Sequence, residues 1–210
     1  MKLILLHGSG HRADSWQETV ARMKTRQEVL CPDLAGLLGG REASYASLCA
    51  AFSEYCGQLD GPLRLCGLSL GGILALEYTL AHPEKVQSLV LIGTPHRVPK
   101  AAFALQNLVF RLLPRSAFDG MALNKRDTFL LGRSMRDLDF RGRVEGIRCP
   151  THIVCGERDR ANRAAAAYFA QAIPGAALTI LENTGHVVNE ENPEALARIL
   201  DAMDTPDGLS

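Results

Sequence analysis

The sequence predicts an α/β fold in which a mainly parallel, six-stranded sheet carries helices on both faces and a small helical cap. Short apolar runs rich in valine, isoleucine and leucine alternate along the chain with segments of helical periodicity. This alternation is typical of strands that are joined by helical crossovers. The length of 210 residues suits one large domain with a substantial core. An apolar share of 47% and a charged share of 22% are ordinary for a globular protein.

Strands and helices are predicted in strict alternation over most of the chain. The predicted strands cover residues 3–6, 28–31, 63–66, 86–92, 152–155 and 177–181, and the predicted helices cover residues 15–26, 44–59, 70–81, 162–172 and 193–203. In a sheet of strand order 2-1-3-4-5-6, the winding reverses between the first and third strands. Ligands bind at the carboxyl ends of the strands at such a reversal, so the loops after these two strands are the first places to look for a site.

Residues 94–148 break the alternation. They contain helix-like stretches at 100–113 and 121–131 and connections rich in arginine and aspartate, but no convincing strand. We therefore expect a core domain of residues 1–93 and 149–210 and a helical lid of residues 94–148. Phe103 and Phe110 belong to a stretch with more apolar surface than one face packed on a sheet needs, so we expect them to line a pocket under this lid. The alternative is an amphipathic helix that buries one face in the core.

The charge balance argues against several classes of partner. Twenty-three acidic and twenty-three basic side chains give no net charge, so nothing indicates binding to nucleic acid or to an anionic membrane. A small neutral molecule is the better substrate, and the sequence predicts no particular oligomeric state. The first apolar run is only as long as a strand, and His7-Gly8 ends it before a signal peptide or a membrane span could form. We expect a cytoplasmic protein.

Six cysteines are present, and none forms a Cys-x-x-Cys pair. Because most of them fall inside predicted strands or helices, we expect buried free thiols rather than disulfides or a metal site. No metal or organic cofactor is implied. Cys66 and Cys155 lie next to the predicted site, so a cysteine nucleophile is a competing interpretation, although neither occupies an exposed corner.

The central motif is Gly67-Leu68-Ser69-Leu70-Gly71, which lies where a predicted strand gives way to a predicted helix. This spacing lets a serine occupy the tip of a tight strand-to-helix turn, with its hydroxyl exposed above the start of the helix. Glycines on either side remove the Cβ atoms that would collide with the neighbouring backbone. The motif alone is weak evidence, because a chain rich in glycine can contain it by chance. Its place between strand and helix strengthens the interpretation of Ser69 as a nucleophile.

A second glycine-rich loop, His7-Gly8-Ser9-Gly10-His11, follows the first predicted strand. Beside the corner, such a loop can direct the backbone N–H groups of Ser9 and Leu70 at one point, which would form an oxyanion hole. A flexible turn or a phosphate loop are the alternatives, but a phosphate loop would require Gly-Lys-Ser or Gly-Lys-Thr. We also expect His11 and Leu68 to line the substrate pocket.

A nucleophilic serine needs a base, and the base needs an anion that fixes its tautomer. Among six histidines, His186 follows the last predicted strand on a loop that can reach over the strand ends, whereas His96 is better placed to line the pocket. The carboxylate should follow the fifth strand, where Asp159 is preferred to Glu157. The chain order is then Ser69, Asp159, His186, as expected for this kind of turn.

The chain resembles the α/β-hydrolase superfamily over essentially its whole length, as a minimal core with a short helical lid. The matching segments are His7-Gly8 with Trp16, Gly67 to Gly72, Ala81 to Val86 leading into Leu89 to Ile92, Gly156 to Asp159, and Gly185-His186 followed by Glu191 and Pro193. The resemblance implies the same nucleophile, acid, base and oxyanion groups.

The chain departs from the family pattern after the second predicted strand. Ala35 and Leu37 stand where the family loop usually has proline and histidine, and Leu68 replaces a residue that is often polar or aromatic. The floor of the site is therefore expected to be more apolar than usual.

We interpret the protein as a serine hydrolase that cleaves a small, mainly apolar carboxylic ester through an acyl-enzyme. A serine at position 69 argues against reactions that need a carboxylate nucleophile, such as epoxide hydrolysis. The same three residues would also serve a C–C bond hydrolase, a lactonase, a thioesterase or a lyase of the menaquinone-pathway type, and the fold does not choose between them. A ligand-binding protein with a vestigial site is the second alternative.

Overall fold

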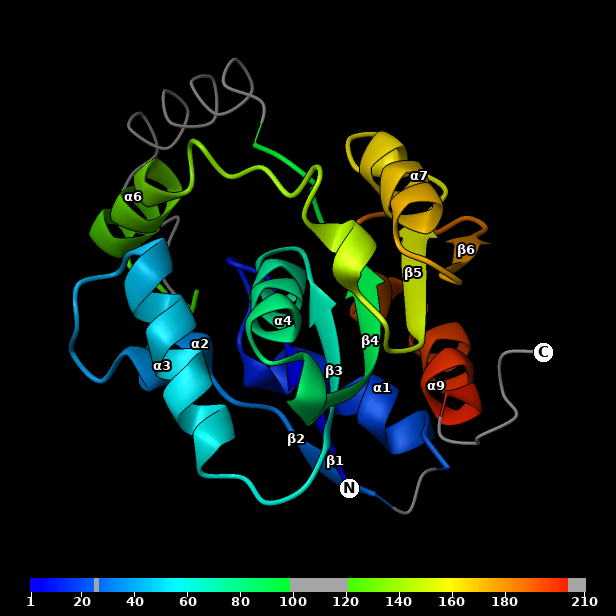
Figure 1. Cartoon of the computed structure of the whole chain (residues 1–210), viewed down its shortest axis with the longest axis horizontal. Coiled ribbons are helices and arrows are strands. Elements are labelled where there is room, and N and C mark those ends of the chain that lie inside the picture. The colour runs from blue at the N-terminus through cyan, green and yellow to red at the C-terminus, as the bar shows by residue number, and fades with distance from the viewer. Residues whose placement is uncertain (25–26, 99–120, 204–210) are drawn as a thin grey trace.

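A six-stranded sheet forms the centre of the structure, a computed structural model that describes residues 1–24, 27–98 and 121–203 (Figure 1). The strand order is β2-β1-β3-β4-β5-β6, and every neighbouring pair is parallel. The predicted α/β class and six-stranded sheet are therefore confirmed, and the strand order is the one assumed above. The reversal at β1 and β3 brings the loop after β1 next to the loop after β3.

The strands match the predicted apolar runs closely. They are β1 (Lys2–Leu6), β2 (Glu28–Leu30), β3 (Leu63–Leu68), β4 (Val86–Ile92), β5 (Thr151–Gly156) and β6 (Ala177–Leu181). β3 is two residues longer than predicted, because Gly67 and Leu68 continue the parallel pairing with β4. β5 gains one residue at each end and β2 loses Cys31.

Helices cover both faces of the sheet, as predicted. One face carries α2 (Leu34–Leu38), α3 (Tyr45–Gly57), α4 (Leu70–Ala81), α6 (Lys125–Ser134) and α7 (Arg163–Ala172), and the other carries α1 (Gln17–Arg22), α8 (Val188–Glu191) and α9 (Pro193–Ala202). Short 3-10 helices cover Ala13–Trp16, Pro83–Lys85 and Val144–Gly146. Successive side chains of a strand point to opposite faces, so Ile4 and Leu6 join one core cluster while Leu3 and Leu5 join the other.

The two largest errors in the predicted helix boundaries, the end of the first helix and the start of the stretch at 121–131, are explained by polar contacts of the backbone. The first helix was expected to reach residue 26, but α1 ends at Arg22, since Met23 is extended and the N–H of Lys24 donates to Asp201. The stretch expected at 121–131 becomes a helix only at Lys125, because Asn124 caps α6 by accepting a hydrogen bond from the N–H of Asp127.

The segment after β2 forms a helix, α2, that the sequence did not predict. Asp33 caps it by accepting from the N–H groups of Ala35 and Gly36, and Gly39 closes it with a left-handed φ of 57°. The departure from the family pattern matters here, because a proline at position 35 would have no N–H to donate. α8, which follows the His186 loop, was also not predicted.

The predicted insertion lies between β4 and β5. Its first helix-like stretch, 100–113 with Phe103 and Phe110, falls outside the described residues. In Figure 1, α6 lies next to one end of α3, where the N–H of Tyr45 donates to the Oγ of Ser134 over 2.8 Å. Arg143 adds an ion pair of 2.7 Å to Glu77 of α4. The described part of the insertion is therefore fastened to two helices of the core.

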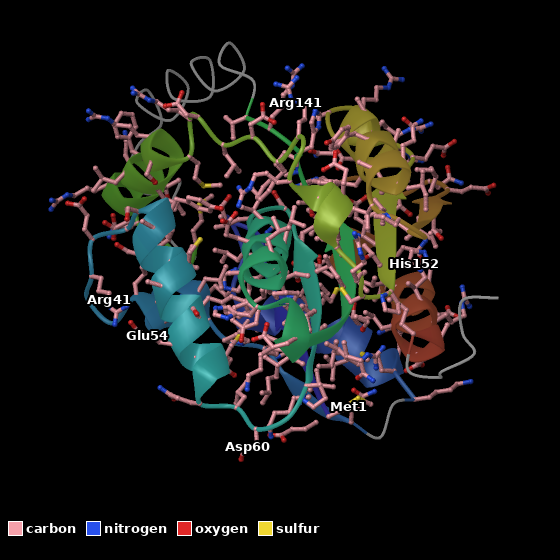
Figure 2. The ribbon with its side chains drawn as sticks, viewed as in Figure 1. Met1, Arg41, Glu54, Asp60, Arg141 and His152 are labelled. Atoms are coloured by element: carbon pink, nitrogen blue, oxygen red, sulfur yellow. The ribbon has the colours of Figure 1, made fainter. Side chains whose placement is uncertain are left out.

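Exposed ion pairs lie on the surface, and one of them joins a loop to α3. Arg41 and Glu54 lie together beside α3 in Figure 2, 2.6 Å apart, and Arg141 pairs with Asp139 at 2.5 Å. These side chains are well exposed, so each pair contributes little to stability. Among the described helices, none has both the length and the apolar character required to cross a membrane.

Candidate active site

Ser69 occupies a strained corner between β3 and α4. Its φ of 53° and ψ of −110° place a residue other than glycine in a region that costs about 1–3 kcal/mol. The backbone is held on both sides, because the N–H of Ser69 donates to the carbonyl of Ile92 over 2.8 Å and its own carbonyl accepts from Ile73 over 3.0 Å. The strained strand-to-helix turn is the one that the sequence motif predicts, and Ser69 at its tip is half-buried.

Two glycines make the corner possible. A Cβ at Gly67 would overlap with the backbone of Gly71, and a Cβ at Gly71 would overlap with the carbonyl of Leu6 at the end of β1. The start of α4 therefore packs directly against the chain that leads into the loop after β1. Leu70 is the first residue of α4, and the N–H groups in the first turn of a helix have no partner within that helix.

The loop after β1 is shaped by its own turn and by His7. The carbonyl of Gly8 accepts from the N–H of His11 over 3.1 Å and lies 2.8 Å from Nδ1 of His7. The Nε2 of His7 accepts from the N–H of Leu34, 3.0 Å away. His7 is therefore neutral, with its proton on Nδ1, and burial lowers the pKa of its imidazole. Ser9 follows this fixed stretch and is exposed.

His186 and Asp159 form a hydrogen-bonded pair at the carboxyl ends of β5 and β6. The Nδ1 of His186 lies 2.7 Å from Oδ2 of Asp159, and the carboxylate is buried while the imidazole is 38% exposed. Burial works against ionisation of Asp159, but the hydrogen bonds from His186 and Asn162 outweigh it and lower the pKa of this carboxyl. An ionised Asp159 keeps the proton of His186 on Nδ1, which leaves Nε2 as the basic atom.

Gly93, which directly follows β4, connects this pair to the serine corner. A Cβ on Gly93 would lie 2.9 Å from Nδ1 and Cε1 of His186 and 3.0 Å from Oδ2 of Asp159, and its φ is 50°. Gly93 follows Ile92, whose carbonyl accepts the N–H of Ser69. His186 and Asp159 thus lie against Gly93, and the N–H of Ser69 bonds to the residue before it, so all three predicted residues lie near the carboxyl end of β4, although they are far apart in the sequence.

The loop that carries His186 is held by Glu191. One carboxylate oxygen accepts from the N–H of Gly185 over 2.6 Å, and the other accepts from the N–H of Val187 over 3.1 Å. These are the two residues that flank His186. The carboxylate therefore fixes the backbone on both sides of the candidate base.

The pocket residues predicted from the sequence are only partly brought together. His11 and Leu68 both approach Gly8, since a Cβ there would lie 3.2 Å from Nδ1 of His11 and 3.6 Å from Cδ2 of Leu68. His96 packs instead against α7, with its ring 5.0 Å from that of Tyr168. Burial lowers the pKa of His96. Phe103 and Phe110 lie outside the described residues.

The cysteines are unsuited to the nucleophile's role. All six lie in the described segments and are free. Cys66 and Cys155 are buried, and burial raises the pKa of both thiols, in the case of Cys155 to about 11. A thiol is a nucleophile only as the thiolate, so both are poor competitors of Ser69. Within the described segments, no three His, Cys, Asp or Glu side chains are grouped to hold a metal ion.

Sequence reasoning missed the roles of three residues: Gly93, Asn162 and Glu191. A glycine directly after a central strand of the sheet was a usable signal for Gly93, because close approach of a side chain to a backbone requires the absence of Cβ. Glu191 was recognised only as part of a family motif. The side chain of Asn162 contacts Asp159 across three residues of an irregular loop, which no periodicity reveals.

Solved structures of hydrolases share this architecture. An esterase from Exiguobacterium antarcticum superimposes with a TM-score of 0.82 at 18% identity, covering 98% of this chain and 92% of that chain. An enol-lactonase from Burkholderia xenovorans gives a TM-score of 0.81 at 18% identity, covering 96% and 90%. At such identities the likeness shows the fold, which is the α/β-hydrolase fold.

Relatives in sequence include two hydrolases. A pimeloyl-acyl-carrier-protein methyl ester esterase from Aromatoleum aromaticum is 28% identical, and the match covers 95% of this chain and 96% of that protein. A monoacylglycerol lipase from Xenopus laevis is 24% identical, with 94% and 73% covered. The sequence model described as the alpha/beta hydrolase family matches residues 3–199. The chain is therefore a hydrolase and belongs to the alpha/beta hydrolase family.

Proposed function

We propose that the protein is a serine hydrolase that cleaves a small, mainly apolar carboxylic ester with Ser69, His186 and Asp159. The observation that carries the proposal is the 2.7 Å hydrogen bond between Asp159 and His186 at Gly93, next to the strained corner of Ser69. A serine hydroxyl is a poor nucleophile until a base takes its proton, and the paired imidazole is such a base.

The reaction then proceeds in two steps. Nε2 of His186 takes the proton of the Ser69 hydroxyl while Oγ bonds to the ester carbonyl carbon, and the N–H groups of Ser9 and Leu70 hold the negative oxygen. The same imidazole returns the proton to the alcohol as the ester C–O bond breaks. Water, activated by His186, then attacks the acyl-enzyme and releases the acid and Ser69. Asp159 stabilises the imidazolium in both steps.

The names of the relatives support an ester as the substrate. One relative is a methyl ester esterase and another is a monoacylglycerol lipase, and both names describe cleavage of a carboxylic ester. Leu68, buried against the loop after β1, supplies an apolar wall near the site. These points favour an apolar acyl group.

Residues 94–148 are proposed to form a lid over this site, separate from the core of residues 1–93 and 149–210. Leu123 and Leu131 join the same apolar cluster as Leu70 and Ile73 of the first turn of α4. Arg143 of the insertion also pairs with Glu77 of this helix, which begins beside Ser69. A lid in this place would exclude water from the acyl-enzyme until the alcohol has left.

Ester turnover with a variant control tests the proposal. The wild-type protein and Ser69→Ala are assayed on p-nitrophenyl esters of increasing acyl length, with a lactone and a thioester alongside. We expect turnover of short apolar esters that falls at least ~10³-fold in the variant. Turnover of only the thioester or the lactone would leave the roles of Ser69, His186 and Asp159 standing and would replace the open-chain ester as the proposed substrate. Equal turnover by both proteins, or ligand retention without product, would refute the proposed function.

A further inference from the structure

Asn162 stands where a helix cap is expected, yet its side chain does not cap the helix. It is the N-cap residue of α7, with φ −104° and ψ −2°, and no side-chain hydrogen bond to the first turn is formed. Asparagine is among the best N-cap residues because its side-chain oxygen can accept from that turn. Asn124 and Asn192 do this for α6 and α9, accepting from Asp127 and Ala195. The amide of Asn162 is used differently.

The amide nitrogen of Asn162 faces the candidate catalytic carboxylate. Nδ2 lies 3.0 Å from Oδ1 and 2.9 Å from Oδ2 of Asp159. An ionised carboxylate can only accept hydrogen bonds, so the nitrogen, not the oxygen, of the amide must point toward it. Both oxygens of Asp159 are thus engaged by one neutral donor.

The same nitrogen lies 3.3 Å from Nδ1 of His186. Because Nδ1 gives its proton to Oδ2 over 2.7 Å, it cannot also accept from Asn162. Asn162 therefore borders the proton that links the base to the acid. The carboxylate has little freedom to rotate, since one oxygen is shared by two donors and the other is held by the amide.

We propose that Asn162 is a positioning residue that holds the Asp159 carboxylate in the orientation in which it accepts the Nδ1 proton of His186. This inference rests on the proposed function. Asn162 contacts no substrate in this role and acts through Asp159 alone. In the absence of this donor, the buried carboxylate would lose a partner that favours its ionised form, and the imidazole would be less firmly oriented.

Other charged or titratable groups around the pair are engaged elsewhere. The Glu191 carboxylate bonds to the N–H groups of Gly185 and Val187, and Arg158 donates to Asn183. Arg163 donates to the carbonyl of Glu157. The Sγ of Cys155 lies 3.9 Å from the carbonyl oxygen of Asp159, not from its carboxylate. Substitutions of the Asn162 side chain therefore test its own contacts with Asp159 and His186.

The decisive variant is Asn162→Asp. Aspartate caps a helix as well as asparagine does, but it replaces the donor with a second carboxylate beside Asp159. We expect the acid limb of the kcat/KM profile to move by about 1 pH unit toward higher pH, because added negative charge favours the protonated imidazole. We expect kcat at pH 7 to fall about tenfold, with KM within about twofold of wild type.

Asn162→Ala and Ser44→Ala separate positioning from capping. Ser44 caps α3 by accepting from the N–H of Ser47, and its hydroxyl lies against that of Ser47 in the same turn. Ser44→Ala should lower Tm by about 2–4 °C and leave kcat unchanged. Asn162→Ala should lower kcat about tenfold and displace the low-field proton NMR signal of the His186 Nδ1–H, which Ser44→Ala should leave in place.

The outcomes distinguish this inference from the proposed function. A wild-type kcat and pH profile in Asn162→Asp would overturn the inference, because that is the behaviour of a plain helix cap. If the wild-type protein shows no turnover that depends on Ser69, the proposed function fails, but the NMR signal still decides the role of Asn162. If the His186 Nδ1–H resonance stays in place in both Asn162 variants, the positioning role of Asn162 is overturned. If the resonance moves in both variants, the positioning role is supported.

Discussion

Gly93 lies against the imidazole of His186 so closely that a methyl group on its Cα would sit 2.9 Å from Nδ1 and Cε1 of the ring. Real Cβ atoms need more room than this, and the same methyl group would lie 3.0 Å from Oδ2 of Asp159. The candidate acid and base therefore depend on the absence of a side chain at the end of β4. The same residue adjoins Ile92, which holds the backbone of Ser69.

Gly93→Ala should lower kcat/KM about 100-fold, because displacing an imidazole by a fraction of an ångström spoils proton transfer. Its positive φ of 50° adds strain of its own. Gly142→Ala is the matched control, since Gly142 has a φ of 76° and open space at its Cβ position. Ester kinetics should show a loss of activity in Gly93→Ala and not in Gly142→Ala, and Tm measures how far each substitution destabilises the fold. Equal losses of activity in both would mean that backbone strain, not contact with His186, is responsible.

Removing the carboxylate of Glu191 should loosen the His186 loop. Glu191→Ala deletes the acceptor for the N–H groups of Gly185 and Val187, and we expect a loss of about 1–2 kcal/mol in the free energy of unfolding. We also expect kcat to fall about tenfold, because the imidazole is less well oriented. Urea unfolding and ester kinetics measure the two effects. The exposed neighbour Glu190 provides the control, and Glu190→Ala should match wild type in both; a wild-type kcat in Glu191→Ala would contradict this role.

The corner around Ser69 should tolerate no side chain at Gly71. A Cβ there overlaps with backbone carbonyls of Leu6 and His7, which cannot move aside without breaking β1 from β3. We expect Gly71→Ala to lose about 3 kcal/mol or more of the free energy of unfolding. Gly57→Ala, at the end of α3 with open space around its Cβ position, should instead gain about 0.5–1 kcal/mol. Denaturant unfolding of both variants tests this, and similar stabilities would show that packing at the corner is looser than the structure indicates.

Acid should destabilise the protein partly through His7. Burial lowers the pKa of its imidazole below 6.5 in the folded state, so below pH ~6.5 the unfolded chain binds a proton that the folded chain does not. The free energy of unfolding therefore falls as the pH drops from ~6.5 toward the lowered folded pKa, by at most about 1.4 kcal/mol per pH unit for this group. His96 and His152 act in the same direction. Asp159 acts only at lower pH, since its pKa is lowered from 3.8.

In His7→Gln, the free energy of unfolding should depend less steeply on pH between pH 5 and 6.5. The proton that the unfolded wild-type chain binds at His7 is then missing. Urea unfolding at several pH values measures the slope for wild type and variant. An unchanged slope would mean that His7 is protonated in the folded state, which its hydrogen bond from the N–H of Leu34 forbids.

The parts of the fold that the sequence predicted well are those with a local pattern. β4 and α4 were predicted to the residue, since an apolar run and a glycine corner mark their ends. α2 was missed because its start depends on the Asp33 side chain accepting from Ala35 and Gly36 rather than on periodicity. The end of α1 was misplaced because a carboxylate of α9, remote in sequence, draws the chain away.

In the candidate site, too, some residues could be predicted from local sequence patterns and others could not. Ser69, Asp159 and His186 follow from chain order and strand ends, and the structure brings the last two into direct contact. Gly93 and Asn162 act through contacts between separate loops, so their roles emerge only when β4, β5 and β6 are placed side by side. His96 stays a prediction as a pocket residue, and its ring contact with Tyr168 of α7 could not be foreseen because it joins two segments remote in the sequence.

If Ser69 is an activated nucleophile, a fluorophosphonate probe should react with its hydroxyl. The wild-type protein and Ser69→Ala are treated with the probe, and peptides are mapped by mass spectrometry. We expect one adduct on Ser69 in the wild-type protein, none in the variant, and slower labelling in His186→Ala because the base is gone. Absence of an adduct on the folded wild-type protein, or labelling at another residue that persists in Ser69→Ala, would contradict it.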